Sequence, residues 1–335
     1  MKDKRTGIQF GELKRVIWAV DAFDEKSVVQ RRVAQVARKL QSIANVTVEP
    51  VYVMTPTELN LSSEYSVPWI QHYRPAAERA LFSLVKALGV KTQEKPKVLI
   101  QNFASTSQAV SSLELYAVHT GTDLILVGSH GKTGMKRLLL GSFAETLLLQ
   151  SRVPVMVVGH EARVLYDFKQ IFFPTDFSKH AEKVFRIAVA LARTIKAKMT
   201  LYHSVPSPVE PVFQSGVYLL GGAWVPVFDY FSRETEHRKH HAEAWVRWAS
   251  HNGVNVELVI EAKGGNLAHS IVRAAKKSHT GLIMMAAKSG PVAATIIGST
   301  TRQVVRSSYC PVWVLRSQIL EAGAVLAKAR VMRAA

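Results

Sequence analysis

Short apolar runs alternate with longer amphipathic stretches along almost the whole chain. Apolar runs of roughly four to eight residues are typical of buried strands, and apolar positions three and four residues apart are typical of helices. The predicted strands lie near residues 14–20, 46–54, 96–102, 123–128, 153–158, 169–174, 198–204, 255–261, 281–286 and 311–315. The predicted helices lie near residues 26–44, 71–89, 105–120, 142–151, 179–195, 232–252, 266–277 and 299–307.

This alternation predicts an α/β fold with parallel strands and with helices on both faces of the sheet, because parallel strands need a crossover connection. Ligands of such sheets bind outside the carboxyl ends of the strands. Two aspartates, Asp21 and Asp176, directly follow predicted strands. We therefore expect chemistry at the carboxyl edge of the sheet.

The chain also repeats itself once. Residues 16–21 (VIWAVD) match 171–176 (IFFPTD), Gly141-Ser142 matches Gly298-Ser299, and residues 153–158 (VPVMVV) match 310–315 (CPVWVL). The offsets are 155, 157 and 157 residues, which indicates two copies of one domain. We predict a first domain over 1–160, a second over 161–316, and a basic amphipathic helical tail over 317–335.

A glycine-rich segment follows the fourth predicted strand. It reads Gly128-Ser129-His130-Gly131, then nine residues, then Gly141-Ser142. A loop of this kind between a strand and a helix start is typical of phosphate binding, since glycine lets the backbone approach the ligand and helix N–H groups attract its charge. It is not a Walker A loop, because Leu126 stands where that motif needs a glycine, and it lies too late in the chain for the dinucleotide fingerprint.

Composition narrows the picture. The net charge is +18, with +7 in residues 1–160 and +11 in 161–335. A basic surface that helps to bind phosphates is the favoured interpretation; nucleic acid is not the favoured partner, although contact with it or with a membrane surface stays open. Cys310 is the only cysteine, so no intrachain disulfide can form. The start of the chain has no apolar signal segment, and Gly216–Phe228 is too short to span a bilayer, so we expect a cytoplasmic protein.

These features together resemble the universal stress protein family in its tandem two-domain form. The resemblance rests on the glycine spacing, the strand-end aspartates, the segment 174–178 (PTDFS) and the closing strand 153–158, and it covers residues 11–316. It implies two Rossmann-like domains of the adenine nucleotide alpha hydrolase-like type, each with a five-stranded parallel sheet. It also implies bound ATP, with or without Mg²⁺, and closing strands that pair between domains, so that the two copies form a pseudo-dimer and chains can form a homo-dimer.

The resemblance also assigns a candidate site in the first copy. Asp21 would contact the adenine edge, although it could instead cap the following turn or helix. Val53 would pack on the base, and the glycine loop would surround the ribose and phosphates. The loop residues implied are Gly128, His130, Gly131, Gly141 and Ser142, with Lys132, Lys136 and Arg137 offsetting phosphate charge; the predicted site also includes Val127 and Phe143.

The second copy departs from this pattern. Ala286 stands in place of Gly128, Ser289 in place of Gly131, and Ser204 in place of Val53. Added Cβ atoms should hinder the approach of the backbone to a phosphate. A weaker second site would use Thr175, Asp176, Ser204, Lys288, Gly298 and Ser299. We expect the first copy to bind nucleotide and the second to bind it weakly, to bind something else, or to be structural.

No set of acid, base and nucleophile accompanies the loop, so we predict a nucleotide-responsive regulator of the stress response with no catalytic residues and at most slow ATP hydrolysis. An adenine-nucleotide-dependent ATPase or transferase is one alternative, and a nucleotide-free oligomeric interaction module is another. His237, His240 and His241 resemble a metal-binding set, but the interleaved Arg238 and Lys239 favour a solvated helix face, and we predict no metal site.

Overall fold

A computed structural model describes residues 13–56, 67–102, 104–129, 140–162, 168–205, 216–218, 224–261, 265–287 and 298–316. The strands are β1 (Arg15–Ala19), β2 (Thr47–Met54), β3 (Lys97–Ile100), β4 (Leu124–Gly128), β5 (Val155–Val158), β6 (Gln170–Pro174), β7 (Lys198–Ser204), β8 (Gly216–Tyr218), β9 (Trp224–Pro226), β10 (Val256–Glu261), β11 (Leu282–Ala287) and β12 (Val312–Arg316). The helices are α1 (Val28–Ala44), α2 (Val67–Ala87), α3 (Thr106–His119), α4 (Ser142–Gln150), α5 (Lys179–Ile195), α6 (Val227–His251), α7 (Leu267–Lys277) and α8 (Ser299–Ser307).

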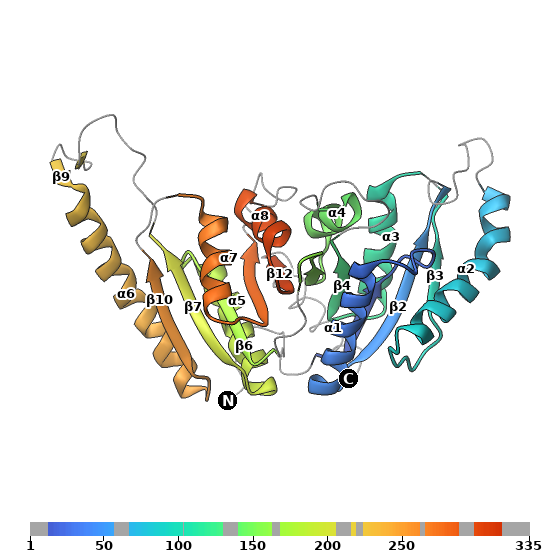
Figure 1. Cartoon of the computed structure of the whole chain (residues 1–335), viewed down its shortest axis with the longest axis horizontal. Coiled ribbons are helices and arrows are strands. Elements are labelled where there is room, and N and C mark those ends of the chain that lie inside the picture. Colours follow the sequence, from blue (N-terminus) through green and yellow to red (C-terminus); the bar gives the residue numbers. More distant parts are fainter. Residues whose placement is uncertain are drawn as a thin grey trace, which may run out of the picture.

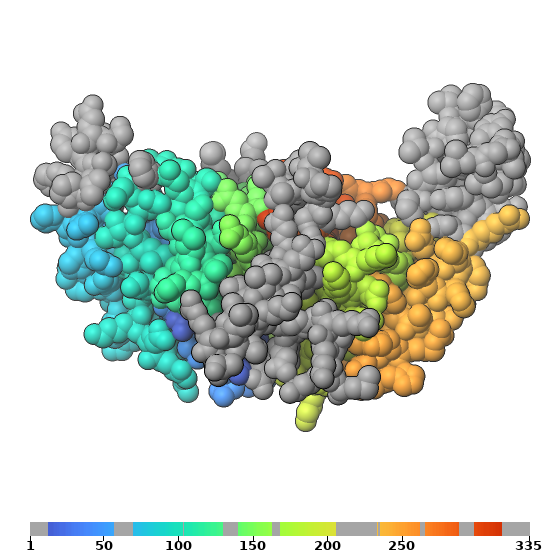
Figure 2. Space-filling view, turned by 180° about the vertical axis from the view of Figure 1, so that it is seen from behind, coloured from blue at the N-terminus to red at the C-terminus, as the bar shows by residue number. Residues whose placement is uncertain are grey.

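The two copies share one continuous sheet. Its strand order is β10-β7-β6-β11-β12-β5-β4-β1-β2-β3, so that five strands come from each half of the chain. Within each half all neighbouring strands run parallel, whereas β5 and β12 run antiparallel where the halves meet. Figure 1 shows the two halves sloping away from this central junction, and Figure 2 shows them from behind, in blue to green and in yellow-green to orange. The predicted α/β fold and the pairing of the closing strands are confirmed.

Both faces of the sheet are covered by helices. Alternate residues of β1 belong to different clusters: Val16 and Trp18 pack on one face, and Ile17 packs on the other. Helices α1, α2, α5 and α6 supply the first cluster, and α3, α4, α7 and α8 supply the second. Because strands buried on both faces have no polar side, they read as continuous apolar runs in the sequence.

Among the helices whose N-cap residue the structure describes, most begin at a side chain that caps the first turn. Ser27 accepts a hydrogen bond from the Gln30 amide at 3.2 Å, Ser178 accepts one from the Ala181 amide, and Ser105 and Asn266 start α3 and α7 in the same way. Such a cap stabilises a helix by about 1 kcal/mol. Helices α4 and α8 begin instead at glycines that offer no side chain, a difference that matters for the site.

A charged group is buried near the amino-terminal edge of the first half. The Glu49 side chain on β2 is almost fully buried, and its Oε2 lies 2.6 Å from Nη2 of Arg15 on β1. The Tyr116 hydroxyl of α3 donates to the other carboxylate oxygen. A buried carboxylate is tolerated only with such partners. The group therefore locks two strands and a helix together at the edge opposite the expected ligand.

The sequence misplaced some boundaries. Helix α2 begins at Val67 and α6 at Val227, four and five residues before the predicted starts. An antiparallel hairpin of β8 and β9 lies within the apolar segment for which no strand was predicted. The predicted tail, 317–335, lies outside the described residues. Among the helices that the structure describes, none is both long and apolar enough to cross a bilayer.

Candidate functional site

Asp21 lies directly beyond the carboxyl end of β1, as the sequence predicts. Its Oδ1 accepts a hydrogen bond from the Phe23 amide at 3.0 Å, so the carboxylate does cap the turn that leads into α1. The buried Gln30 side chain holds the same residue from behind: Nε2 donates to the Asp21 carbonyl at 2.6 Å, and Oε1 accepts from its amide at 3.3 Å. The turn is therefore fixed in place at the edge where a ligand is expected.

The two ends of the glycine loop lie together. Gly128 is the last residue of β4, and the Ser129 amide donates to the Val158 carbonyl on β5 at 2.9 Å. The buried Ser129 carbonyl then accepts from the Gly141 amide at 2.5 Å. This contact closes the loop into a ring at the carboxyl edge of the sheet. His130, Gly131, Lys132, Lys136 and Arg137 lie in the loop itself, outside the described residues.

Helix α4 starts at this closure with no side-chain cap. Gly141 is its N-cap residue, in extended conformation, and Ser142 is its first helical residue. The first amides of a helix have no partner within the helix and carry a partial positive charge. A glycine cap supplies no side chain that would compete with an anion for these amides, as a Ser or Asp side chain would.

Apolar side chains border the closed loop on the α3–α4 face of the sheet. Val127 is buried between β1 and β5, next to Ala19 and Val157 in register. Val53 and Phe143 are partly buried against the same cluster. This combination of apolar side chains and helix amides without a side-chain cap suits a flat apolar group with an attached anion.

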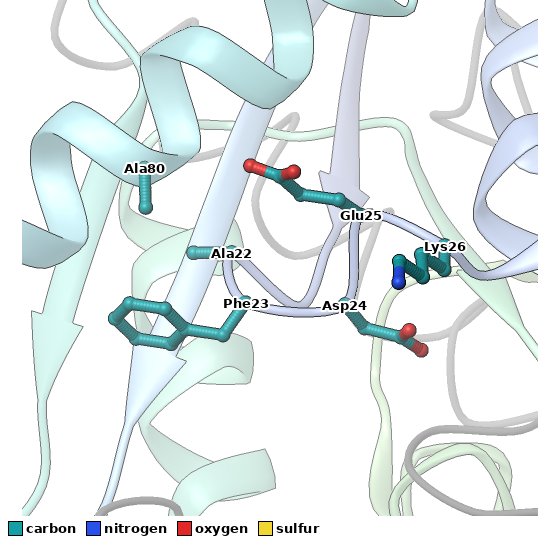
Figure 3. A pocket seen from close by; sticks show the side chains of 6 residues that line it. All are labelled: Ala22, Phe23, Asp24, Glu25, Lys26 and Ala80. Atoms are coloured by element: carbon teal, nitrogen blue, oxygen red, sulfur yellow. The ribbon is translucent and has the colours of Figure 1, made fainter.

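A hollow of about 290 Å³ lies beside the Asp21 turn. It is lined by Ala22, Phe23, Asp24, Glu25, Lys26 and Ala80 (Figure 3). The Phe23 ring, 45% exposed, lies edge-on to Tyr52 with ring centroids 5.8 Å apart. Because Tyr52 and Val53 are adjacent on β2, they face opposite sides of the sheet. The hollow is therefore next to the predicted site but on the other face, and nothing in the sequence singled it out.

In the second half, the strand-end residues Thr175 and Asp176 also shape a turn. Thr175 Oγ1 accepts from the Phe177 amide at 2.9 Å, and Asp176 Oδ1 accepts from the Ser178 amide at 3.0 Å. Phe177 sits at φ +56, an unusual conformation for a large side chain, and its ring contacts His203 with centroids 5.0 Å apart. The motif builds a rigid entry into α5.

The carboxyl ends of the two outer strands differ between the halves: they carry polar residues on β7 and β10 but apolar residues on β2 and β3. Val53 pairs with Leu99 in the first half, whereas its counterpart Ser204 pairs with Glu261. The Glu261 carboxylate accepts from the Tyr202 hydroxyl at 3.1 Å and lies 3.3 Å from Arg273 Nη2. Burial, followed by the neighbouring carboxylate, raises the pKa of Tyr202 to about 12. The sequence pattern pointed to Ser204 but not to Tyr202, Glu261 or Arg273. The available signal was that Tyr202 lies two residues before Ser204 and therefore on the same face of β7.

Helix α8, the counterpart of α4 in the second half, also begins at a glycine. Gly298 is the N-cap of α8 without a side-chain bond, and Ser299 follows it. Within the part of the chain that is described, a Cβ on Gly298 would meet no atom within 4 Å. Lys288 lies outside the described residues. No three His, Cys, Asp or Glu side chains among the described residues converge on a point that could hold a metal ion.

Comparison with known protein families shows which family has this architecture. The sequence profile described as the universal stress protein family matches the chain twice, over residues 12–159 and 167–316. The chain belongs to this family. It is a tandem universal stress protein with two Rossmann-like domains, as the resemblance in the sequence implies.

Individual relatives show how this tandem universal stress protein compares. The curated universal stress protein MJ0577 of Methanocaldococcus jannaschii is 53% identical over 38 residues, which span 11% of this chain and 24% of that relative. A universal stress protein structure from Archaeoglobus fulgidus covers 92% of this chain and 99% of its own at 18% identity, with a TM-score of 0.63. The protein PA1789 of Pseudomonas aeruginosa covers 96% and 99% at 14% identity, with a TM-score of 0.59. At these identities the solved structures support the fold alone.

Proposed function

We propose that the first half of this universal stress protein binds one adenine nucleotide, ATP, at the carboxyl edge of its sheet. The observation that carries the proposal is the hydrogen bond between the Ser129 carbonyl and the Gly141 amide, which brings the ends of the glycine loop together beside an uncapped helix start. A closed loop next to helix amides that no side chain caps is suited to phosphate oxygens.

The other predicted residues fit a nucleotide in this place. Val53 and Phe143 would offer an apolar surface for the base, supported by the buried Val127, and the Asp21 carboxylate would accept from the adenine amino group. The Ser142 hydroxyl would bind a phosphate oxygen at the helix start. Gly128, His130 and Gly131 would surround the ribose and phosphates, with Lys132 and Arg137 neutralising charge, together with Mg²⁺ where it is present.

The second half is not proposed as an equal site. Glu261 introduces a carboxylate at the corner where the first half has Leu99, and Ser204 replaces Val53 there. An adenine ring would lose an apolar contact and would desolvate a charged pair, which is costly. Thr175, Asp176, Gly298 and Ser299 retain only part of the first-half pattern.

In the cell we propose a nucleotide-responsive regulator of the stress response, acting in the cytoplasm. The division into domains 1–160 and 161–316, with 317–335 as a separate helical tail, belongs to the same proposal. An ATPase or transferase on this scaffold is the second candidate; sustained product formation in stoichiometric proportion to ATP consumed would favour it over a binding protein.

Titration calorimetry with ATP, combined with native mass spectrometry, tests the proposal. We expect one nucleotide per chain, and Ser142→Ala should weaken binding roughly 10- to 100-fold, because one hydrogen bond to a charged group is lost. Ser299→Ala, the equivalent change in the second half, is the matched control and should leave the affinity unchanged. Absence of ATP binding, or weakening by the second-half variant alone, would show that the proposed site is wrong.

A further inference from the structure

Equivalent residues of the two copies meet at the junction between the halves. Counterparts in this region are 157 positions apart, as Gly141 and Gly298 show. In the antiparallel pair of β5 and β12, Met156 stands directly opposite Trp313, its own counterpart. The junction is therefore a pseudo-twofold axis on which each half meets the other in the way that two identical subunits would.

The most informative contact across this axis is an ion pair between counterparts. Oε1 of Glu145 in α4 lies 3.0 Å from Nε of Arg302 in α8, and Oε2 lies 3.5 Å from an Nη atom of Arg306. Glu145 and Arg302 are 157 positions apart and occupy the same place in their helices. All three side chains are only 24–37% exposed, so their charges are partly shielded from solvent.

The ends of the closing strands β5 and β12 also differ in charge between the two halves. Arg316 ends β12, is 4% exposed, and donates from its guanidinium to the Leu149 carbonyl at the end of α4. Its counterpart in the first half is Gly159, where a Cβ would lie 3.4 Å from the Ser308 carbonyl oxygen at the end of α8. The second half thus contributes a third arginine to the junction, whereas the first half has a glycine without a side chain at the equivalent position.

If a half paired with a copy of itself, these contacts between opposite charges would become contacts between like charges. Two first halves would bring Glu145 against Glu145. Two second halves would bring Arg302 and Arg306 against themselves, with Trp313 opposite Trp313. Like charges that are partly desolvated repel strongly, and two indoles would overpack a site that now holds an indole and a thioether. Only the mixed pairing matches both charge and size.

We propose that this junction is a heterospecific interface, in which the opposite charges of Glu145 and the Arg302–Arg306 pair select the second half of the chain as the partner of the first, against a second copy of either half. The surface that would make a symmetric dimer of single domains is used inside the chain. The competing explanation is that the covalent connection alone brings the halves together and that the charges contribute nothing to the pairing.

A mutant cycle on the full-length chain separates these explanations. Glu145→Arg, and separately Arg302→Glu with Arg306→Glu, should each lower the melting temperature by roughly 3–6 °C, and the combination of all three should melt within about 2 °C of the unmodified protein. Raising the salt concentration should shrink the losses. Glu243 and Arg247 of α6, paired at 3.4 Å over the outer strand β10, give the control cycle, in which shifts should stay below about 2 °C.

Hydrogen exchange measured on the same variants shows where stability is lost. Amides of β5 and β12 should exchange several-fold faster in the two mismatched variants and return to protection in the combination, while the outer strands β3 and β10 keep their rates. If Glu145→Arg does not fold, the milder cycle of Glu145→Gln with Arg302→Gln and Arg306→Gln replaces it. Additive losses in the combination, or unchanged exchange at the junction, would overturn the proposal.

Discussion

The Ser129 carbonyl accepts a hydrogen bond from the Gly141 amide at 2.5 Å and so joins the two ends of the glycine loop. This bond helps to hold the end of β4 and the start of α4 together. Gly141 adopts φ −62, a value that proline also takes, but the proline Cδ would occupy the place of the donated hydrogen and push the Ser129 carbonyl away.

We therefore predict that Gly141→Pro opens the loop, destabilises the protein by at least about 1 kcal/mol and weakens ATP binding, since the donor is lost and the ring displaces its acceptor. Urea denaturation and calorimetry measure the two effects. Gly298→Pro, at the equivalent start of α8 with φ −54, is the control and should leave ATP affinity unchanged. Unaltered ATP binding by Gly141→Pro would mean that closure of the loop is irrelevant to the ligand.

Val53→Ser places in the first half the residue that the second half carries at this position. We expect ATP affinity to fall about 5- to 10-fold, because the apolar contact with the base is lost, and stability to fall by about 1 kcal/mol, because Val53 also packs on the apolar cluster. The reciprocal change, Ser204→Val, should leave ATP affinity as it is. Equal effects of both variants would contradict the assignment of the nucleotide to the first half.

Glu49→Ala should destabilise the protein by about 3–5 kcal/mol, because it leaves the Arg15 guanidinium and the Tyr116 hydroxyl without their buried acceptor. Glu94 contacts the same arginine at 3.3 Å but is 55% exposed. Glu94→Ala is thus the matched control, and we expect it to cost no more than about 1 kcal/mol. Chemical denaturation of both variants gives the comparison, and similar losses would show that burial of Glu49 contributes nothing special.

Alkaline pH should destabilise the fold through two tyrosines. Burial, with a neighbouring carboxylate, raises the pKa of Tyr116 and of Tyr202 to about 12, whereas the unfolded chain titrates near 10. The unfolded state therefore releases its protons first. The free energy of unfolding should be unaffected by these groups below pH 10 and should fall as the pH rises from about 10 to 12.

Replacing both tyrosines by phenylalanine removes the titrating groups and should flatten this alkaline decline, after allowance for the lower stability of the double variant at neutral pH. Denaturation midpoints across the pH range provide the measurement, and ultraviolet difference spectra report the ionisation itself. A decline of the same steepness in the double variant would assign it to other groups, such as lysines.

Much of the fold was readable because its determinants are local. Runs such as 124–128 are apolar throughout, since both faces of the sheet are covered, and Ser27 and Ser178 mark helix starts by capping them. Helices α2 and α6 began earlier than predicted because their first turns lie in apolar, turn-rich sequence, where periodicity is weak.

The candidate site was only partly readable. The glycine loop, Asp21 and the turn that Asp21 caps are local features, but the cluster of Tyr202, Glu261 and Arg273 depends on which strands become neighbours. Glu261 and Arg273 are separated by the start of a helix, and Tyr202 comes from another strand. No short-range pattern connects such residues.

The sequence by itself determined the two repeated α/β halves, their strands and helices, and the unequal glycine loops, because apolar periodicity and glycine spacing are written into consecutive residues. Only the tertiary structure decided what meets across the junction. Glu145 and Arg302 lie 157 positions apart, and their opposite charges acquire meaning when the antiparallel pairing of β5 and β12 brings α4 against α8. Charge complementarity between distant residues is a property of their distance in space, which local patterns do not encode.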